Sequence, residues 1–305
     1  MGRFLQTPLS PALPWHLYRS DADVIVLHLP NPTAEIGWLL ARSRAALVVR
    51  YHSDVVRQAS AMKVYGPIQH RLLQKAALIL PTSTPYLETS PVLARHKERC
   101  RVVPLGIETE AFAAAAPEDV AELHARYGSP FVLFSGKHRY YKGLSVLVDA
   151  ATSIGAPVVI AGDGPERAAL MAQAQAKGVT IHFPGPLSHE ELVAHLHGAA
   201  VFAFPSVARS EAFGISIMEA HACGCPVVAT RLGTGVEFIN EDGKTGFNVP
   251  PGDGQALADA INTLLDDEGL RQRMGDYARQ RVKTDFHIAK IAEQEWQCYR
   301  EVAPC

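Results

Sequence analysis

The sequence lacks a long apolar run. Across its 305 residues, no stretch approaches the roughly 18–20 consecutive apolar residues that a membrane-spanning helix needs. The first fifteen residues include three prolines and no apolar core, so we do not expect them to act as a secretory signal peptide. Neither observation points to a protein that is embedded in a membrane or exported across one.

Charge of one sign and paired cysteines are also scarce. The formal net charge of −2 excludes the strongly basic balance typical of nucleic-acid-binding proteins, so no nucleic-acid partner is expected. The five cysteines form no C-x-x-C pair, and Cys223 and Cys225 flank Gly224 as small packing residues would. No acidic D-x-D cluster follows a predicted strand, so no metal site is expected. This cysteine usage favours a reducing compartment, and we expect a cytoplasmic protein.

The sequence does contain a regular alternation of apolar runs and helical stretches, in a chain long enough for about two domains. Such nearly continuous apolar runs are typical of parallel strands covered on both faces, so the predicted fold class is α/β. Leu105–Pro117 is interpreted as the linker between two domains. The predicted strands are Val24–Leu29, Ala46–Arg50, Leu78–Leu80, Arg101–Pro104, Phe131–Ser135, Val158–Ala161, Thr180–Phe183, Val201–Phe204, Val227–Ala229 and Gly246–Val249.

Three further expectations concern the first domain. Residues 1–20 are rich in proline and are expected to be irregular. A helix over Val64–Ala77 should be interrupted at Gly66-Pro67, because proline removes a backbone donor inside a helix. A second helix is expected over Thr84–Lys97.

The most informative stretch is Val201–Thr230, which reads as strand, loop, helix and strand. Two carboxylates stand out in it, Glu211 in the loop and Glu219 in the helix, with seven residues between them. Backbone N–H groups without helical partners are expected at Gly214, Ile215 and Ser216. Carboxylate acceptors beside a helix N-terminus favour a ligand that carries both hydroxyl groups and phosphates. For two isolated glutamates, the simpler interpretation would be an ordinary βαβ unit with a solvated Glu211 and with Glu219 on the helix surface.

The sequence motifs around these glutamates resemble those of the retaining glycosyltransferases of family 4, which have the GT-B fold and an E-x7-E motif. The matching motifs are FPS before the loop, EAFG, and MEA-x-A-x-G-x-PVVAT. The resemblance implies two Rossmann-like parallel-sheet domains. Residues 1–107 would form a partial acceptor-side domain, residues 108–285 the nucleotide-sugar domain, and residues 286–305 a helix that packs back on the first domain. Family members begin with roughly 80 further residues that form three more strands and a glycine-rich loop, so the first domain is expected to be truncated.

The resemblance also assigns roles to charged residues. Glu211 would bind hydroxyl groups of the donor sugar, and Glu219 those of the ribose. The word GKHRYYKG (residues 136–143) resembles the family's GR-x4-KG, whose basic pair, here Lys137 and Lys142, holds the donor diphosphate. Lys137 stands where the family has arginine, so the bidentate fork of a guanidinium is lost. A solvated basic loop is the alternative interpretation.

Other predicted contacts are weaker in sequence. His52, in the word YHSD at a strand end, matches a family histidine that faces the donor sugar. The resemblance also implies that backbone groups at Gly185 and Leu187 contact the nucleobase. His28 also matches a family word but lies inside a predicted strand, so it is interpreted as structural. The word GDGPE (residues 162–166) fits a phosphate-binding loop and a simple tight turn equally well.

The resemblance implies a metal-independent, retaining glycosyltransferase that takes its sugar from a UDP- or GDP-sugar and needs no other cofactor. The acceptor would be a carbohydrate or a lipid-linked glycan, because Thr230–Asn240 resembles a word of polysaccharide-building enzymes. One alternative is a catalytically weak nucleotide-sugar-binding subunit, given the truncated first domain. Another is a GT-B-like phosphorylase, but the lysine motif that its cofactor needs is not found.

Two surface features predict partners. The charge run RHKER (residues 95–99) is either a solvated helix end or a contact with the inner face of an anionic membrane. In a truncated sheet, Val24–Leu29 would have an open edge, and such an edge favours self-association.

Overall fold

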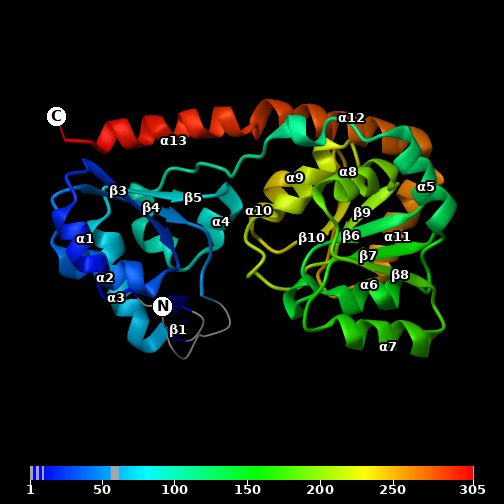
Figure 1. The fold of residues 1–305 in the computed structure, drawn as a ribbon, viewed down its shortest axis with the longest axis horizontal. Helices are drawn as coiled ribbons and strands as arrows, with labels where there is room; N and C mark the ends of the chain where they lie inside the picture. Colours follow the sequence, from blue (N-terminus) through cyan, green and yellow to red (C-terminus); the bar gives the residue numbers. More distant parts are fainter. Residues whose placement is uncertain (1–2, 5–6, 9, 56–61, 305) are drawn as a thin grey trace. The chain divides into compact units, whose positions relative to one another are not determined.

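The computed structural model describes residues 3–4, 7–8, 10–55 and 62–304. The chain divides into two compact units, one formed by Met1–Pro104 with Ile291–Cys305 and the other by Leu105–Lys290. Each unit contains a parallel β-sheet flanked by helices (Figure 1). The predicted α/β fold with two parallel sheets is therefore confirmed. No helix in the described part of the chain is long and apolar enough to cross a membrane.

The larger unit, Leu105–Lys290, contains a six-stranded sheet. Its strands are β6 (Val132–Ser135), β7 (Val158–Ala161), β8 (Ile181–Gly185), β9 (Val201–Phe204), β10 (Val227–Thr230) and β11 (Gly246–Val249). They pair in parallel in the order β11-β10-β9-β6-β7-β8. The chain therefore starts in the middle of the sheet, runs to one edge, and returns to build the other half outward. This is the doubly wound order, and its switch point lies between β6 and β9.

Helices cover both faces of this sheet. One hydrophobic core lies between one face of the sheet and the helices α5 (Pro117–Tyr127), α8 (His189–Gly198), α9 (Ile215–Ala222) and α10 (Gly235–Ile239). A second core packs the other face against α6 (Leu144–Ala150), α7 (Arg167–Lys177) and α11 (Gly254–Asp266). The helix α12 (Glu268–Asp285) contributes to both cores, and short 3-10 turns, η2 (Thr109–Phe112) and η3 (Tyr140–Lys142), complete the unit. Figure 1 shows α8 and α9 on one side of the sheet and α6 and α7 on the other.

The smaller unit has a three-stranded parallel sheet in the order β3-β4-β5. Its elements are β3 (Val24–Leu29), β4 (Ala46–Tyr51), β5 (Leu78–Pro81), α1 (Leu13–Arg19), α2 (Pro32–Ala41), α3 (Met62–Lys75), α4 (Thr84–Thr89), η1 (Leu93–Arg99) and the helix α13 (Ile288–Val302), which belongs to this unit from Ile291 onward. A short antiparallel pair, β1 (Arg3–Phe4) with β2 (Thr7–Pro8), precedes them. On one face of the sheet, Ile291 and Cys298 of α13 pack against Val48 and Leu80.

Two proline-based expectations are wrong in this unit. Residues 1–20 are not wholly irregular, because α1 forms there with a proline in its first turn, where no backbone donor is needed. The helix α3 continues through Pro67 instead of breaking there. Leu72 and Leu73 of the same helix are fully buried, and this packing holds the helix together despite the lost hydrogen bond.

Two other elements of this unit differ in the structure from their sequence predictions. The helix expected over Thr84–Lys97 is split into α4 and η1, with Pro91 between them. Arg101–Pro104 forms no strand, although Cys100 makes an isolated bridge with Ile79. The buried Arg50 guanidinium donates to the carbonyls of Val103 and Pro104, at 2.5 and 2.7 Å, so these carbonyls bond to a side chain instead of a further strand.

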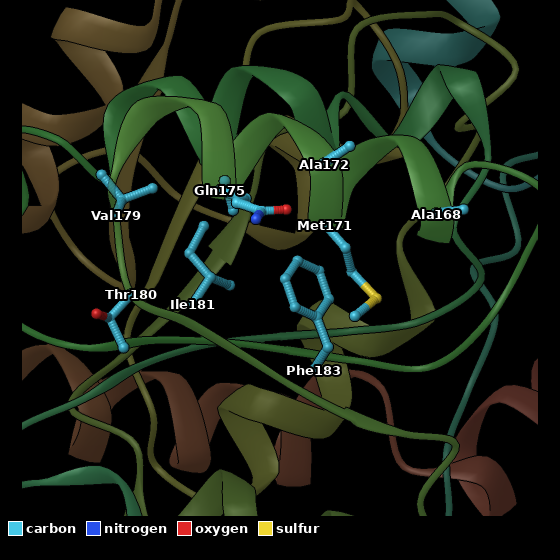
Figure 2. Close-up of a pocket in the computed structure, with 9 residues that line it drawn as sticks. Ala168, Met171, Ala172, Gln175, Val179, Thr180, Ile181 and Phe183 are labelled. Atoms are coloured by element: carbon cyan, nitrogen blue, oxygen red, sulfur yellow. The ribbon is translucent and has the colours of Figure 1, made fainter.

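The outer edge of the larger sheet is hollowed between β8 and α7. The cavity measures about 610 Å³ and is lined mainly by apolar side chains of these two elements. Figure 2 shows Phe183 and Ile181 from the strand facing Met171 on α7. None of the residues predicted to bind a ligand lines this cavity, so it is separate from the site that the sequence indicates.

Candidate functional site

The candidate site lies at the switch point of the larger sheet. The loops that follow β6 and β9 leave adjacent parallel strands and lead to helices on opposite faces of the sheet. In doubly wound sheets, ligands bind at such a point, outside the carboxyl ends of the strands. The first loop carries Lys142 and the second carries Glu211. The ammonium Nζ of Lys142 lies 2.6 Å from the carboxylate Oε2 of Glu211. Two residues that the sequence assigned to separate motifs are therefore in direct contact.

The Lys142–Glu211 pair is largely shielded from solvent. Its side chains are 12% and 11% exposed, so their attraction is screened less than that of a surface pair. The hydroxyl of Ser206 donates to the same carboxylate oxygen at 3.4 Å. The ammonium also lies 4.8 Å from the ring centroid of Phe204, at cation–π distance. An ammonium has three donors, so Lys142 can bind a second anion while it remains paired with Glu211.

A glycine allows the two loops to meet. Gly143 follows Lys142 in the left-handed conformation, with φ of +64°, and a Cβ there would lie 2.0 Å from the carbonyl oxygen of Pro205. The backbone after β6 thus packs directly on the end of β9, and only glycine fits. This contact places Lys142 beside the loop of Glu211.

The GDGPE motif at residues 162–166 also has a packing role. Gly162 has φ of +111°, and a Cβ there would lie 2.0 Å from the carbonyl oxygen of Gly136. The N–H of His138 donates to the carbonyl of Asp163 at 2.9 Å. The tight turn after β7 therefore supports the loop that carries Lys137 and Lys142.

The loop of Glu211 is held from the side of β10. Arg209 donates to the carbonyls of Leu232 and Gly233, at 3.2 and 2.9 Å. The N–H of Gly235 donates to the carbonyl of Ala212 at 2.8 Å. The sequence interpretation missed Arg209, and nothing in the local pattern distinguishes it from a solvated loop arginine. The stretch 230–240 therefore acts as a scaffold for the glutamate loop.

Glu219 lies in α9, half-buried. Burial raises the pKa of its carboxyl, while the charges of His189 and Lys142 act in the opposite direction. Lys142 therefore acts electrostatically on both carboxylates of the E-x7-E pattern. The helix α9 begins after Gly214, and no side chain caps its N-terminus. The backbone N–H groups at Gly214, Ile215 and Ser216 therefore stay predicted donors to a bound anion.

The other residues of this unit that are predicted to bind the donor make different contacts from the Lys142–Glu211 pair. The Lys137 side chain is exposed and, within the described part of the chain, has no hydrogen bond or ion pair. The carbonyl of Gly185 accepts a hydrogen bond from the N–H of Gly162 at 2.7 Å. Leu187 packs its side chain against the core. Among the described residues, no three His, Cys, Asp or Glu side chains are grouped so that they could hold a metal ion.

His52 lies in the smaller unit, immediately after β4. Burial, and next the nearby His28 and Arg50, together lower the pKa of its imidazole to about 4. The ring is therefore neutral near pH 7. Its Nε2 lies 2.8 Å from Nδ1 of His28, which is exposed at the end of β3. The histidine interpreted from sequence as structural is thus the hydrogen-bond partner of the predicted functional one.

Comparison with known proteins shows the family. Residues 116–281 match the family described as "Glycosyl transferases group 1". The sequence is 37% identical over 268 residues to the D-rhamnosyltransferase WbpZ of Pseudomonas aeruginosa, covering 88% of this chain and 70% of WbpZ. It is 38% identical over 269 residues to the O-antigen chain mannosyltransferase C of Escherichia coli, covering 88% of this chain and 72% of that enzyme. The chain belongs to the group 1 glycosyltransferases.

The fold has close counterparts among solved structures. The crystal structure of the Anabaena protein HepE in complex with UDP superposes with a TM-score of 0.80 at 22% sequence identity, covering 95% of this chain and 81% of HepE. The predicted GT-B-like architecture of two Rossmann-like parallel sheets is therefore confirmed.

Proposed function

We propose that this protein transfers a sugar from a UDP- or GDP-sugar to a carbohydrate or lipid-linked acceptor, with retention of anomeric configuration and without a metal ion. The contact between Lys142 and Glu211 at the switch point carries the proposal. It joins a phosphate-binding cation to an acceptor of sugar hydroxyls, in the crevice where doubly wound sheets bind nucleotides. The unit Leu105–Lys290 would bind the nucleotide sugar, and the smaller unit would bind the acceptor.

The reaction places demands on this site that its residues meet. As the bond from the anomeric carbon to the diphosphate oxygen breaks, positive charge develops on the sugar and negative charge on the leaving group. Lys142, the exposed Lys137 and the N-terminal amides of α9 would stabilise the departing diphosphate. Glu219 would accept hydrogen bonds from the ribose hydroxyls. No cofactor beyond the donor is required.

Glu211 would act on the sugar. Its Oε2 holds Lys142, and its other carboxylate oxygen would accept hydrogen bonds from sugar hydroxyls. Binding of the sugar and the diphosphate is then coupled, because one ion pair orients both contacts. In the retaining step, the acceptor oxygen bonds to the anomeric carbon on the face that the diphosphate leaves. The acceptor proton passes to the leaving phosphate oxygen.

The acceptor class is proposed from relatives. One relative is named a D-rhamnosyltransferase and another an O-antigen chain mannosyltransferase. We extend this class to the present chain and place it in the assembly of a surface polysaccharide or glycolipid. The scaffold loop at residues 230–240, which supports Glu211, is the part of the sequence that resembles polysaccharide-building enzymes.

A donor-turnover assay tests the proposal. The purified chain should release nucleoside diphosphate from a UDP- or GDP-sugar, faster when a mannose-containing acceptor glycan is present, and EDTA should not change the rate. Product NMR should show the donor's anomeric configuration. Nucleotide binding without turnover for any donor would instead favour the inactive-subunit alternative. Loss of activity in EDTA would contradict metal independence.

Self-association through β3 is a further part of the proposal. Among the described strands only β4 pairs with β3, so the other edge of β3 offers unpaired backbone groups. A groove of about 270 Å³ lies between β3 and α13, and its lining includes Val24, Val26 and the 55% exposed Trp296. A second copy of the chain would pair at this edge. Light scattering should show a mass that rises with protein concentration, and a monomer at every concentration would contradict it.

Membrane contact is proposed for η1. Arg95, Lys97 and Arg99 are exposed in it, whereas His96 is buried. Exposed cations on one short segment favour attraction to anionic lipid. The chain should therefore sediment with vesicles that contain anionic lipid but not with neutral ones. Replacing Arg95 and Lys97 by Glu should abolish this, and equal sedimentation with both vesicle types would contradict an electrostatic contact.

A further inference from the structure

His28 and His52 form a pair at the carboxyl end of the smaller sheet. In the parallel register, His28 of β3 lies opposite Arg50 of β4, and His52 follows Arg50 by two residues. Side chains two apart on a strand share a face, so both imidazoles lie on the same side of the sheet. Their rings are nearly parallel, with centroids 5.1 Å apart and an interplanar angle of 16°. Nδ1 of His28 lies 2.8 Å from Nε2 of His52.

This geometry constrains where the protons lie. A hydrogen bond between two imidazole nitrogens requires a proton on one and a lone pair on the other. Because His52 faces His28 with Nε2, its Nδ1 is the ring nitrogen left for any other partner. If His28 donates, His52 carries its own proton on Nδ1 and is a donor there. If His28 accepts, Nδ1 of His52 is an acceptor.

The surroundings of His52 fix its backbone but not its ring. Its N–H donates to the carbonyl of Leu29 at 3.0 Å. Two residues later, the Asp54 carboxylate accepts from the hydroxyls of Tyr51 and Ser90, at 2.8 and 2.7 Å. The charged groups that act on the His52 ring are Arg50, from β4, and Glu295, from α13, which pair with each other at 3.6 Å. Among the described residues, the hydrogen-bond partner of the His52 ring is His28.

We propose that His28 is a positioning residue, which orients the His52 imidazole and selects its neutral tautomer so that Nδ1 is presented to a hydroxyl group of the sugar substrate. The ligand rests on the proposed function, whereas the pairing itself does not. His28 would not touch the substrate. Its effect would pass through the hydrogen bond to His52.

The direct test is ¹⁵N NMR of the imidazole nitrogens in the full chain. In the native protein, His52 should show the shifts of one predominant tautomer near pH 7. In His28→Ala, these shifts should move toward the averaged values of a free neutral imidazole. His28→Asn keeps a hydrogen-bonding group near the position of Nδ1 and should restore much of the tautomer preference. Unchanged His52 shifts in His28→Ala would overturn the proposal.

Kinetics provide the second arm. His28→Ala should lower kcat/KM for the donor by about threefold to tenfold, the effect of one neutral hydrogen bond, and His28→Asn should recover part of it. The double variant with His52→Ala should be no slower than His52→Ala alone, because both changes remove one effect. Additive losses would overturn the proposal. The exposed His16→Ala serves as the control with unchanged activity.

The two arms separate the two hypotheses. If the native chain turns over no donor, the proposed function fails, and the NMR arm still decides whether His28 sets the His52 tautomer. If turnover is normal and the NMR shifts do not respond to His28, only the positioning role fails. His28 is exposed, so circular dichroism should show that each variant at this position stays folded.

Discussion

The Lys142 ammonium and the Glu211 carboxylate lie 2.6 Å apart, although they come from the ends of different strands. Neither charge can therefore be changed without affecting the other. Because the pair is largely buried, removing one partner leaves the other in a poorly solvated place. Variants at the two positions should differ in which substrate part they affect, and this difference separates their roles.

Replacing Glu211 by Gln should lower sugar transfer by orders of magnitude, because the neutral amide cannot hold the sugar and Lys142 as the carboxylate does. The fold should be kept, since the change is isosteric and lies in a loop. Steady-state turnover at saturating donor measures the effect. Glu190→Gln, at an exposed position in the first turn of α8, is the matched control. Near-normal turnover by the Glu211 variant would exclude its role in sugar binding.

Replacing Lys142 by Ala should weaken nucleoside-diphosphate binding by about 1.5–3 kcal/mol, the range of a charge-assisted hydrogen bond. Affinity for the free nucleoside should hardly change, because the nucleoside has no diphosphate. Isothermal titration with both ligands measures this difference. Lys137→Ala is the matched control and should lose less, since that side chain is exposed. Equal losses for nucleoside and diphosphate would make Lys142 a structural residue.

Replacing Glu219 by Ala should weaken nucleotide affinity more than turnover at saturating donor, because the proposed contact is to the ribose. Burial raises the pKa of Glu219, so its charged form is lost at a higher pH than that of an ordinary glutamate. Nucleotide affinity should therefore fall on acidification, beginning above the usual carboxyl range. The test is titration across pH for the native chain and for Glu219→Gln. A Gln variant that shows the same acid-side loss would place the titrating group elsewhere.

His221, fully buried in α9, should make stability depend on pH. Burial, and next the charge of Arg281, lowers its pKa to about 3 from an unfolded value of 6.5. The unfolded state therefore binds the proton first, and stability should fall as the pH drops from 6.5 toward 3, by at most about 1.4 kcal/mol per pH unit. Chemical denaturation at several pH values measures this slope.

The control for His221 is a pair of variants. His221→Leu should make the acid-side slope shallower, whereas His16→Leu, at an exposed position, should leave it unchanged. An unchanged slope in His221→Leu would assign the acid sensitivity to other groups.

Several elements could be read from the sequence because local chemistry determines them. The strands β9 and β10 begin where predicted and end within one residue of the prediction, since strands covered on both faces appear as unbroken apolar runs. The helix α5, which we did not predict, has a recognisable start, with Pro117 at its first position and Glu118 and Asp119 in its first turn. The continuation of α3 through Pro67 had no such signal, because buried contacts elsewhere in the helix outweigh the local preference.

The sequence by itself determined the alternation of strands and helices, the family words around Glu211 and Glu219, and the loop glycines. These depend on neighbours along the chain and on side-chain periodicity. Only the tertiary structure decided that β6 lies beside β9, that Lys142 meets Glu211, and that His28 pairs with His52. Each of these relationships joins segments that are distant in sequence. Strand order and register create them, and a local pattern of residues does not encode which strand ends will be neighbours.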